Sequence, residues 1–100
     1  MNVIVDICLV PIGVGVSVSK YIAACQEVLV EAGFVPQLHA YGTTVEGEWD
    51  AVFAAVRRCH ECVHKMGAPR ISTTIKAGTR TDRQQTMADK VRSVKEQLGG

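Results

Sequence analysis

Residues 35–47, VPQLHAYGTTVEG, contain two strand-like runs in direct succession, joined at a glycine. Residues 35–41 alternate between apolar and polar side chains, as a half-buried strand does. Gly42 turns the chain, and residues 43–47 read as a further short strand. Two successive strands placed between helical segments are typical of a split β-α-β arrangement.

The segments on both sides of this pair of strands are predicted to be helical. Before it, Ser17 or Ser19 can cap a helix that runs to about Ala32, and Gly33 is its stop. After it, a second helix starts near residues 48–50 and ends at residues 66–67, before Pro69. The apolar spacing in both segments indicates one buried stripe along each helix.

The first and the fourth strand along the chain, together with a last helix, complete the predicted fold. Residues 2–10, NVIVDICLV, are rich in β-branched side chains, and residues 70–78, RISTTIKAG, alternate. After the polar loop 78–85, a last helix covers residues 86–98, where Thr86 and Asp89 can form a capping box. The order β-α-β-β-α-β-α predicts an α+β fold: a ferredoxin-like βαββαβ sandwich with an additional C-terminal helix, in a single domain over residues 1–100.

The composition argues against several classes of protein. The net charge is +1, without the basic stripe that a nucleic-acid-binding protein carries. No segment approaches the roughly 20 apolar residues of a membrane span. Four cysteines without a recognisable signal sequence indicate free thiols in a reducing compartment, so we expect a cytoplasmic protein.

The alternation along the predicted strands separates one apolar face of the sheet from one polar face. The apolar face, expected under the helices, collects Val3, Val5, Ile7, Leu9, Leu38, Ala40, Thr43, Val45, Ile71, Thr73, Ile75 and Ala77. The other face collects Asp6, Cys8, Gln37, His39, Tyr41, Thr44, Glu46, Ser72, Thr74 and Lys76. A solvated antiparallel face explains this second set, and a surface that binds a small polar heterocycle or a second sheet explains it equally.

Residues 57–64, RRCHECVH, resemble a metal or redox motif at first sight. At about 100° per residue, however, Cys59 points into the buried stripe, while Cys62 and His60 lie on opposite flanks and His64 lies mostly outside. Ligands that point apart cannot share one zinc ion. We therefore predict structural packing for the cysteines and no metal site.

Several motifs together resemble the small, single-domain members of the thiamine-binding, YkoF-like protein family, including fungal members. They are VPIG (10–13), SKY (19–21), GTTVEGEWDAVF (42–53), HE (60–61) and MGAPRISTTIKAGTR (66–80). The resemblance implies a ferredoxin-like fold, dimers or tetramers assembled through the sheet and the final helix, and binding of thiamine or its hydroxymethylpyrimidine moiety. It does not imply catalysis, and we expect a protein without enzymatic activity and without a further cofactor. The loop PIGVGVS departs from the family by carrying valines where hydroxyl-rich residues are expected.

The resemblance places the expected ligand site around the GTTVEG segment. Thr43, Thr44 and Glu46 lie within it, and Gly13 and Ser19 lie in the loop and helix start after the first strand. A thiazolium cation suits Glu46 or an aromatic ring such as Tyr41 or Trp49. Because strands one and three are neighbours in a ferredoxin-like sheet, Asp6 is expected beside Thr44 and Glu46.

Other functions remain open at this point. Arg70, Lys76, Arg80 and Arg83 could hold a phosphate, although no Walker pattern is present. A nucleophilic enzyme would need Cys8 beside His39, and strand three is expected to separate them. The chief alternative is a regulatory or structural oligomeric module with a different ligand or none.

The last helix carries a narrow apolar seam, spaced four, three and four residues apart, that suits a partner helix. Its members are Met87, Val91, Val94 and Leu98. A small domain gains burial by self-association, so we expect a dimer or tetramer that uses the sheet and residues 86–98. Packing of the same helix against its own domain is the alternative.

Overall fold

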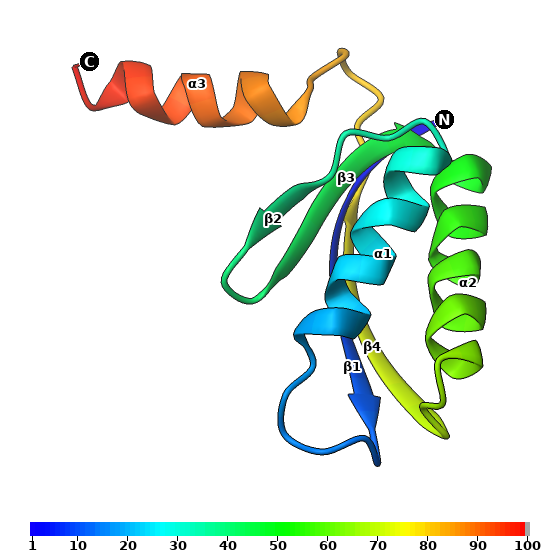
Figure 1. Ribbon diagram of the computed structural model, residues 1–100. Helices are drawn as coiled ribbons and strands as arrows, with labels where there is room; N and C mark the ends of the chain where they lie inside the picture. Colours follow the sequence, from blue (N-terminus) through cyan, green and yellow to red (C-terminus); the bar gives the residue numbers. More distant parts are fainter. Residues whose placement is uncertain (100) are drawn as a thin grey trace.

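A four-stranded antiparallel sheet with the order β2-β3-β1-β4 organises residues 1–99, which are the residues described by this computed structural model (Figure 1). The elements are β1 (Asn2–Ile12), α1 (Ser19–Glu31), β2 (Gln37–His39), β3 (Gly42–Glu48), α2 (Trp49–Lys65), β4 (Arg70–Gly78) and α3 (Met87–Gln97). α1 and α2 lie side by side on one face of the sheet. The predicted ferredoxin-like α+β fold with an added helix is confirmed.

The register of the sheet separates its two faces as the alternation predicted. One row of paired residues, Leu38, Thr43, Ile7 and Ile75, belongs to the face that α1 and α2 cover. The next row, Gln37, Thr44, Asp6 and Lys76, belongs to the opposite face, called the open face below. The covered face contributes to an aliphatic core with α1 and α2, formed mainly by Val3, Val5, Ile7, Leu9, Leu29, Val45, Val52 and Val63.

Glycines end both of the packed helices. Gly33 and Gly67 have φ values of +95° and +110°, a backbone conformation that glycine adopts without steric cost. At each end two amides fold back onto the last turn, as in Phe34 N–H to Leu29 C=O at 3.0 Å, which is the Schellman pattern. The predicted stop at Gly33 is confirmed. The predicted serine cap of α1 is wrong, because Val18 occupies the N-cap and no side chain accepts a hydrogen bond there.

The hairpin of β2 and β3 extends beyond the cover of α1. β2 has three residues instead of the seven expected, and Leu38 is 62% exposed although it belongs to the covered face. The apolar row of the sheet is therefore incompletely covered at this end. That gap in the cover is where the first candidate site lies.

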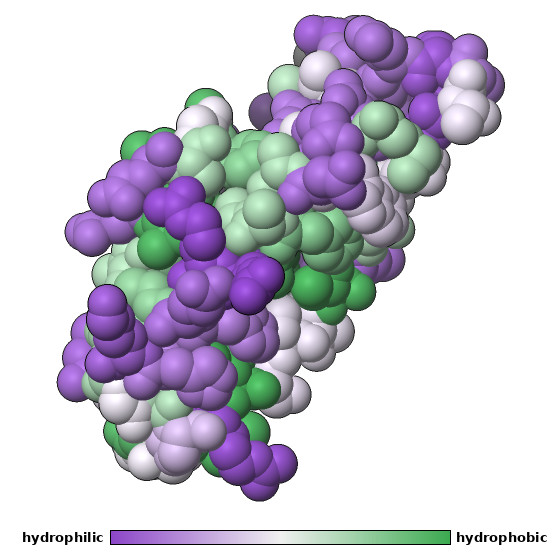
Figure 2. All heavy atoms as spheres, turned by 90° about the vertical axis from the view of Figure 1, so that its right-hand side faces the viewer, coloured by the Kyte–Doolittle hydropathy of each residue, from purple (hydrophilic) through white to green (hydrophobic). Residues whose placement is uncertain are grey.

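α3 projects from the sandwich instead of packing on it (Figure 1). The predicted capping box is confirmed, since Thr86 and Asp89 exchange side-chain to backbone hydrogen bonds of 3.0 Å each. No residue of α3 is buried, and Val91, Val94 and Leu98 are 54%, 60% and 80% exposed. In Figure 2 this end of the chain forms a mostly hydrophilic lobe beyond the body of the molecule. Apart from Met87 at its start, which is half-buried, the seam does not pack against its own domain, which was the alternative expectation.

Within residues 1–99, no helix combines the length and the apolar character that crossing a bilayer requires.

Candidate functional site

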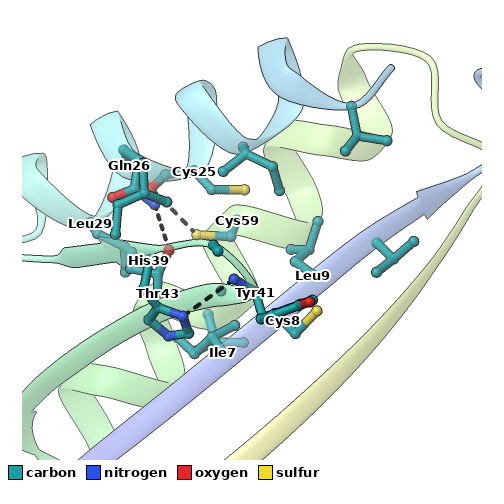
Figure 3. A pocket seen from close by; sticks show the side chains of 17 residues that line it. Ile7, Cys8, Leu9, Cys25, Gln26, Leu29, His39, Tyr41, Thr43 and Cys59 are labelled. Carbon is teal, nitrogen blue, oxygen red and sulfur yellow. Dashed lines mark hydrogen bonds between the residues drawn. The ribbon is translucent and has the colours of Figure 1, made fainter. Parts of the chain in front are cut away.

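A cavity of about 250 Å³ opens between α1, β1 and the β2–β3 hairpin, on the covered side of the sheet (Figure 3). Apolar side chains dominate its wall, among them Ile7, Leu9, Val18, Ile22, Leu29, Leu38 and Val56. The space exists because small side chains occupy its inner positions: Cys25 on α1, Thr43 on β3 and Cys59 on α2. Larger residues at these three positions would fill it.

One polar pair stands inside this apolar wall. The side-chain amide of Gln26 donates a 2.7 Å hydrogen bond to the hydroxyl oxygen of Thr43, which is itself buried. The pair leaves the second N–H and the carbonyl oxygen of the amide, together with the Thr43 hydroxyl hydrogen, free to meet a ligand. An apolar slot with one such pair can orient a flat polar ring.

Two thiols lie next to each other at the inner end of the cavity. The Cys59 thiol donates a long hydrogen bond, 3.8 Å from Sγ, to the backbone oxygen of Cys25. The contact between the two side chains lowers the pKa of Cys59, against the opposing effect of burial. The same contact, helped by burial, raises the pKa of Cys25 far above its ordinary value. Cys59 is therefore the thiol of this pair that ionises first.

At the rim of the cavity, His39 connects the hairpin to β1. Its Nε2 lies 2.6 Å from a carboxylate oxygen of Asp6, and the Tyr41 amide donates to its Nδ1 at 3.3 Å. With Nδ1 as acceptor, Nε2 carries the proton and donates to Asp6. The same Asp6 oxygen accepts from the Thr44 hydroxyl at 3.3 Å. The imidazole thus crosses β3 to reach β1, a contact that the expected separation of strands one and two did not suggest.

Gly42 makes this crossing possible. A Cβ at this position would lie 2.5 Å from the Ile7 carbonyl oxygen and 3.4 Å from Cε1 of His39. Any side chain there would push the ring and the central strand apart. The polar network at the rim therefore depends on a residue without a side chain.

A second, larger hollow of about 930 Å³ lies on the open face, under the segment 79–86. Its charged lining residues are Asp6, Glu46, Lys76, Arg80, Arg83 and Lys90. Several of these are already engaged: Glu46 accepts the Met87 amide of α3 at 2.8 Å, and Arg80 pairs with Asp82 at 2.6 Å. Arg80 holds the pKa of the exposed Asp82 carboxyl at about 2. The Glu46 contact ties the start of α3 to the sheet, and the Arg80 contact lies within the connecting segment.

The structure divides the predicted ligand residues among three places. Thr43 and Tyr41 line the first cavity, whereas Asp6 and Glu46 line the hollow on the open face. Thr44 faces the open side and contacts Asp6, as expected for neighbouring strands. Ser19 and Gly13 line neither space; Ser19 is exposed at the start of α1, and Gly13 faces Pro69.

Sequence reasoning missed Gln26 as a site residue. A signal was present, because Gln26 lies four residues after Ile22 and three before Leu29, within the apolar stripe of α1. A polar residue inside a buried stripe needs a hydrogen-bond partner, and Thr43 provides it. His39 was placed on the polar face, but its reach across Gly42 depends on tertiary contacts.

The residues of RRCHECVH point as the helical wheel predicted. Cys59 is 4% exposed, Cys62 and His60 are half-buried on the flanks, and His64 is exposed. His60 lies 2.7 Å from the Thr73 hydroxyl, and Nδ1 of His64 donates to the Ala68 carbonyl at 2.8 Å. Among residues 1–99, no three histidine, cysteine or acidic side chains converge on one point.

Comparison with known proteins gives consistent matches over nearly the whole chain. A family model described as "Thiamine-binding protein" matches residues 5–95. The UPF0045 protein sll0230 of Synechocystis is 66% identical over 94 residues, covering 94% of this chain and 78% of the relative. The fungal UPF0045 protein ECM15 of Eremothecium gossypii is 41% identical over 99 residues, covering 98% and 94%.

Two solved structures share the fold. Protein MJ1052 of Methanocaldococcus jannaschii superposes with a TM-score of 0.88 at 28% identity, covering 95% of this chain and 97% of that one. A Thermotoga maritima protein, TM0486, assigned provisionally to thiamine biosynthesis or salvage, has a TM-score of 0.80 at 21% identity, covering 94% and 99%. The second match supports the fold alone.

Proposed function

We propose that this chain, which belongs to the thiamine-binding protein family, is a non-catalytic protein. Its proposed ligand is thiamine or the hydroxymethylpyrimidine moiety of thiamine. The observation that carries the proposal is the apolar cavity with the Gln26–Thr43 pair in its wall. No metal and no further cofactor enter the proposal.

The size of the cavity favours one ring over the whole vitamin. Pockets that enclose drug-sized ligands measure about 300–1,000 Å³, and this one holds about 250 Å³. The pyrimidine is therefore the part expected inside, with the thiazolium of thiamine left at the mouth. Tyr41, which lines the cavity and is 86% exposed, offers its ring to that cation.

The polar pair matches the hydrogen-bonding groups of an aminopyrimidine. Its exocyclic amine donates and its ring nitrogens accept, so the Gln26 amide can accept from one and donate to the other. Apolar side chains such as Ile7 and Leu29 can cover the faces of the ring. Burying a polar ring without these partners would be unfavourable, which gives the pair its role in selecting the ligand.

The test is calorimetric titration of the reduced protein with hydroxymethylpyrimidine and with thiamine. Thr43→Val removes the hydroxyl at nearly constant volume, and a lost hydrogen bond of about 1 kcal/mol weakens binding roughly fivefold. Thr74→Val is the control, since this exposed threonine of β4 faces the open side and lines neither hollow. Saturable heat that Thr43→Val weakens and Thr74→Val preserves supports the proposal; absence of saturable heat from the wild type at millimolar ligand overturns it.

One observation favours the alternative, a regulatory or structural oligomeric module with a different ligand or none. Glu46, the carboxylate of the family-like GTTVEG segment, bonds to the first amide of α3 instead of standing free. This contact gives the segment a structural task that needs no ligand. A wild type without saturable binding would leave the alternative as the better account.

Assembly and location form the remaining parts of the proposal. The exposed seam of α3 and the polar open face of the sheet suit a dimer or tetramer built from further copies of this chain. The four cysteines are free thiols in the structure, and free thiols persist in the cytoplasm. We place the protein there.

A further inference from the structure

Two cysteines from different helices meet in the wall of the cavity. Cys25 on α1 is 6% exposed and Cys59 on α2 is 4% exposed, and both line the cavity. Figure 3 shows the two side chains approaching each other from the two helices. The Cys59 sulfur lies 3.8 Å from the backbone oxygen of Cys25, which is two covalent bonds from its Cα.

We infer that Cys25 and Cys59 are a reversible disulfide site that joins α1 to α2 in the wall of the ligand cavity. A disulfide needs a sulfur–sulfur distance of about 2.05 Å and Cβ atoms about 3.5–4.5 Å apart. The Cys59 sulfur lies against the main chain of Cys25, so closure requires rotation of the two side chains and an approach of α1 toward α2. Disulfides of cytosolic proteins are typically transient and responsive to oxidants.

The oxidant of this inference is a peroxide, and the reaction balances with one molecule of hydrogen peroxide. The Cys59 thiolate attacks one peroxide oxygen, the O–O bond breaks, and hydroxide leaves as a sulfenic acid forms. Cys25 sulfur then attacks the Cys59 sulfur and expels the hydroxyl group, which leaves as water with the Cys25 proton. Two thiols lose two electrons in total, and the peroxide becomes two waters.

The reactivity of the pair agrees with this order of events. The thiolate is the nucleophile in thiol chemistry, and contact with Cys25 lowers the pKa of Cys59. The cavity gives the oxidant its path, because about 250 Å³ is several times the roughly 30 Å³ that one water occupies in the liquid. Burial from bulk solvent otherwise restricts access to larger reagents.

The other two cysteines provide the internal comparison. Cys62 lies on the same helix as Cys59, three residues on, and Cys8 lies on β1; both are half-buried. Neither has a hydrogen bond to another cysteine among the contacts of residues 1–99. The contact of Cys59 with the main chain of Cys25 therefore favours linkage of this pair over linkage to Cys62 or Cys8.

Closure changes the cavity because Gln26 follows Cys25 in α1. Drawing α1 toward α2 at Cys25 displaces Gln26 from Thr43, whose hydrogen bond at 2.7 Å tolerates little displacement. This consequence, and only this one, rests on the proposed ligand-binding function. We expect the oxidised protein to bind hydroxymethylpyrimidine roughly tenfold more weakly than the reduced protein, a difference of about 1.4 kcal/mol.

The experiment oxidises the reduced protein with one equivalent of hydrogen peroxide, alkylates the remaining thiols and maps the tryptic peptides. Cys25 lies in residues 21–57, and Cys59 and Cys62 lie in residues 59–65, so a linked pair of these peptides is the expected product. Fragmentation of the wild-type pair locates the bond without any variant. Cys62→Ala should retain the linkage and Cys59→Ala should lose it, and dithiothreitol should reverse it.

Each outcome decides one part of the account. Alkylated Cys25 after oxidation, or its linkage to Cys62 or to another chain, overturns the disulfide site. Linkage without a change in affinity overturns the control of the cavity. If the reduced protein binds the heterocycle but oxidation produces no Cys25–Cys59 linkage, only the disulfide inference is refuted. If a reversible linkage forms in a protein that binds no heterocycle, only the proposed function is refuted.

Discussion

Gly42→Ala tests whether the close approach of the hairpin to β1 holds the rim of the cavity. The new Cβ would lie 2.5 Å from the Ile7 carbonyl oxygen, whereas ordinary contacts begin at 3.4 Å. The backbone must therefore separate by about 0.9 Å. Ile7 belongs to a central strand that is hydrogen-bonded on both sides. Its backbone therefore cannot shift without disturbing the pairing with β3 and β4. Overpacking of this kind costs about 1–3 kcal/mol of the free energy of unfolding.

The assay is urea unfolding followed by circular dichroism, with Gly78→Ala as the matched control. A Cβ on Gly78, which lies on the neighbouring strand β4, meets nothing within 4 Å. We expect Gly42→Ala to lower the unfolding midpoint with an unchanged slope, and Gly78→Ala to stay within about 0.5 kcal/mol of the wild type. Equal stability of the two variants would refute the reasoning about the close approach.

Three further predictions concern the ligand, the assembly and pH. Gln26→Leu should weaken binding of hydroxymethylpyrimidine in calorimetry by roughly tenfold, whereas Glu27→Leu, on the exposed side of α1, should not; equal losses would contradict the role of the amide. Val94→Gln should lower the mass measured by light scattering and Glu96→Gln should leave it unchanged; an unchanged mass in both argues against assembly through the seam. The backbone and side chain of Thr86 lower the pKa of Asp89, so this carboxylate stabilises α3 above its unfolded pKa of about 3.9 and loses that effect as the pH falls through the lower folded value. The amide resonances of α3 should therefore show fraying below about pH 4 before those of α1 do, and simultaneous loss would contradict this cap.

The local sequence predicted the architecture because its signals act over short distances. Alternation in residues 2–10 and 70–78 and the glycines after α1 and α2 specify strands and helix ends within a few residues. The burial of Cys59 likewise follows from its position on the helical wheel of α2. The family resemblance, carried by near-continuous motifs, is confirmed by the family match over residues 5–95.

The candidate site was less predictable because long-range contacts determine it. Asp6 was expected beside Thr44 and Glu46 in one patch of the polar face, with Thr43 on the opposite face, and the strand register agrees with this division. The partners that engage the two carboxylates of this patch were not expected. Asp6 accepts from His39 and Glu46 from α3, and neither partner is near in sequence. The polar pair of the cavity joins residues 17 positions apart, and strand periodicity carries no information about such a contact.

The central claim is that a pyrimidine enters the cavity beside Gln26 and Thr43, and nuclear magnetic resonance of the isotope-labelled, reduced protein tests it most directly. Titration with hydroxymethylpyrimidine should shift the side-chain amide signals of Gln26 and the backbone amide of Thr43, saturating together, while Thr74 on the open face stays unchanged. Saturable shifts confined to open-face residues such as Asp6 and Lys76, or no saturable shifts, would contradict the account.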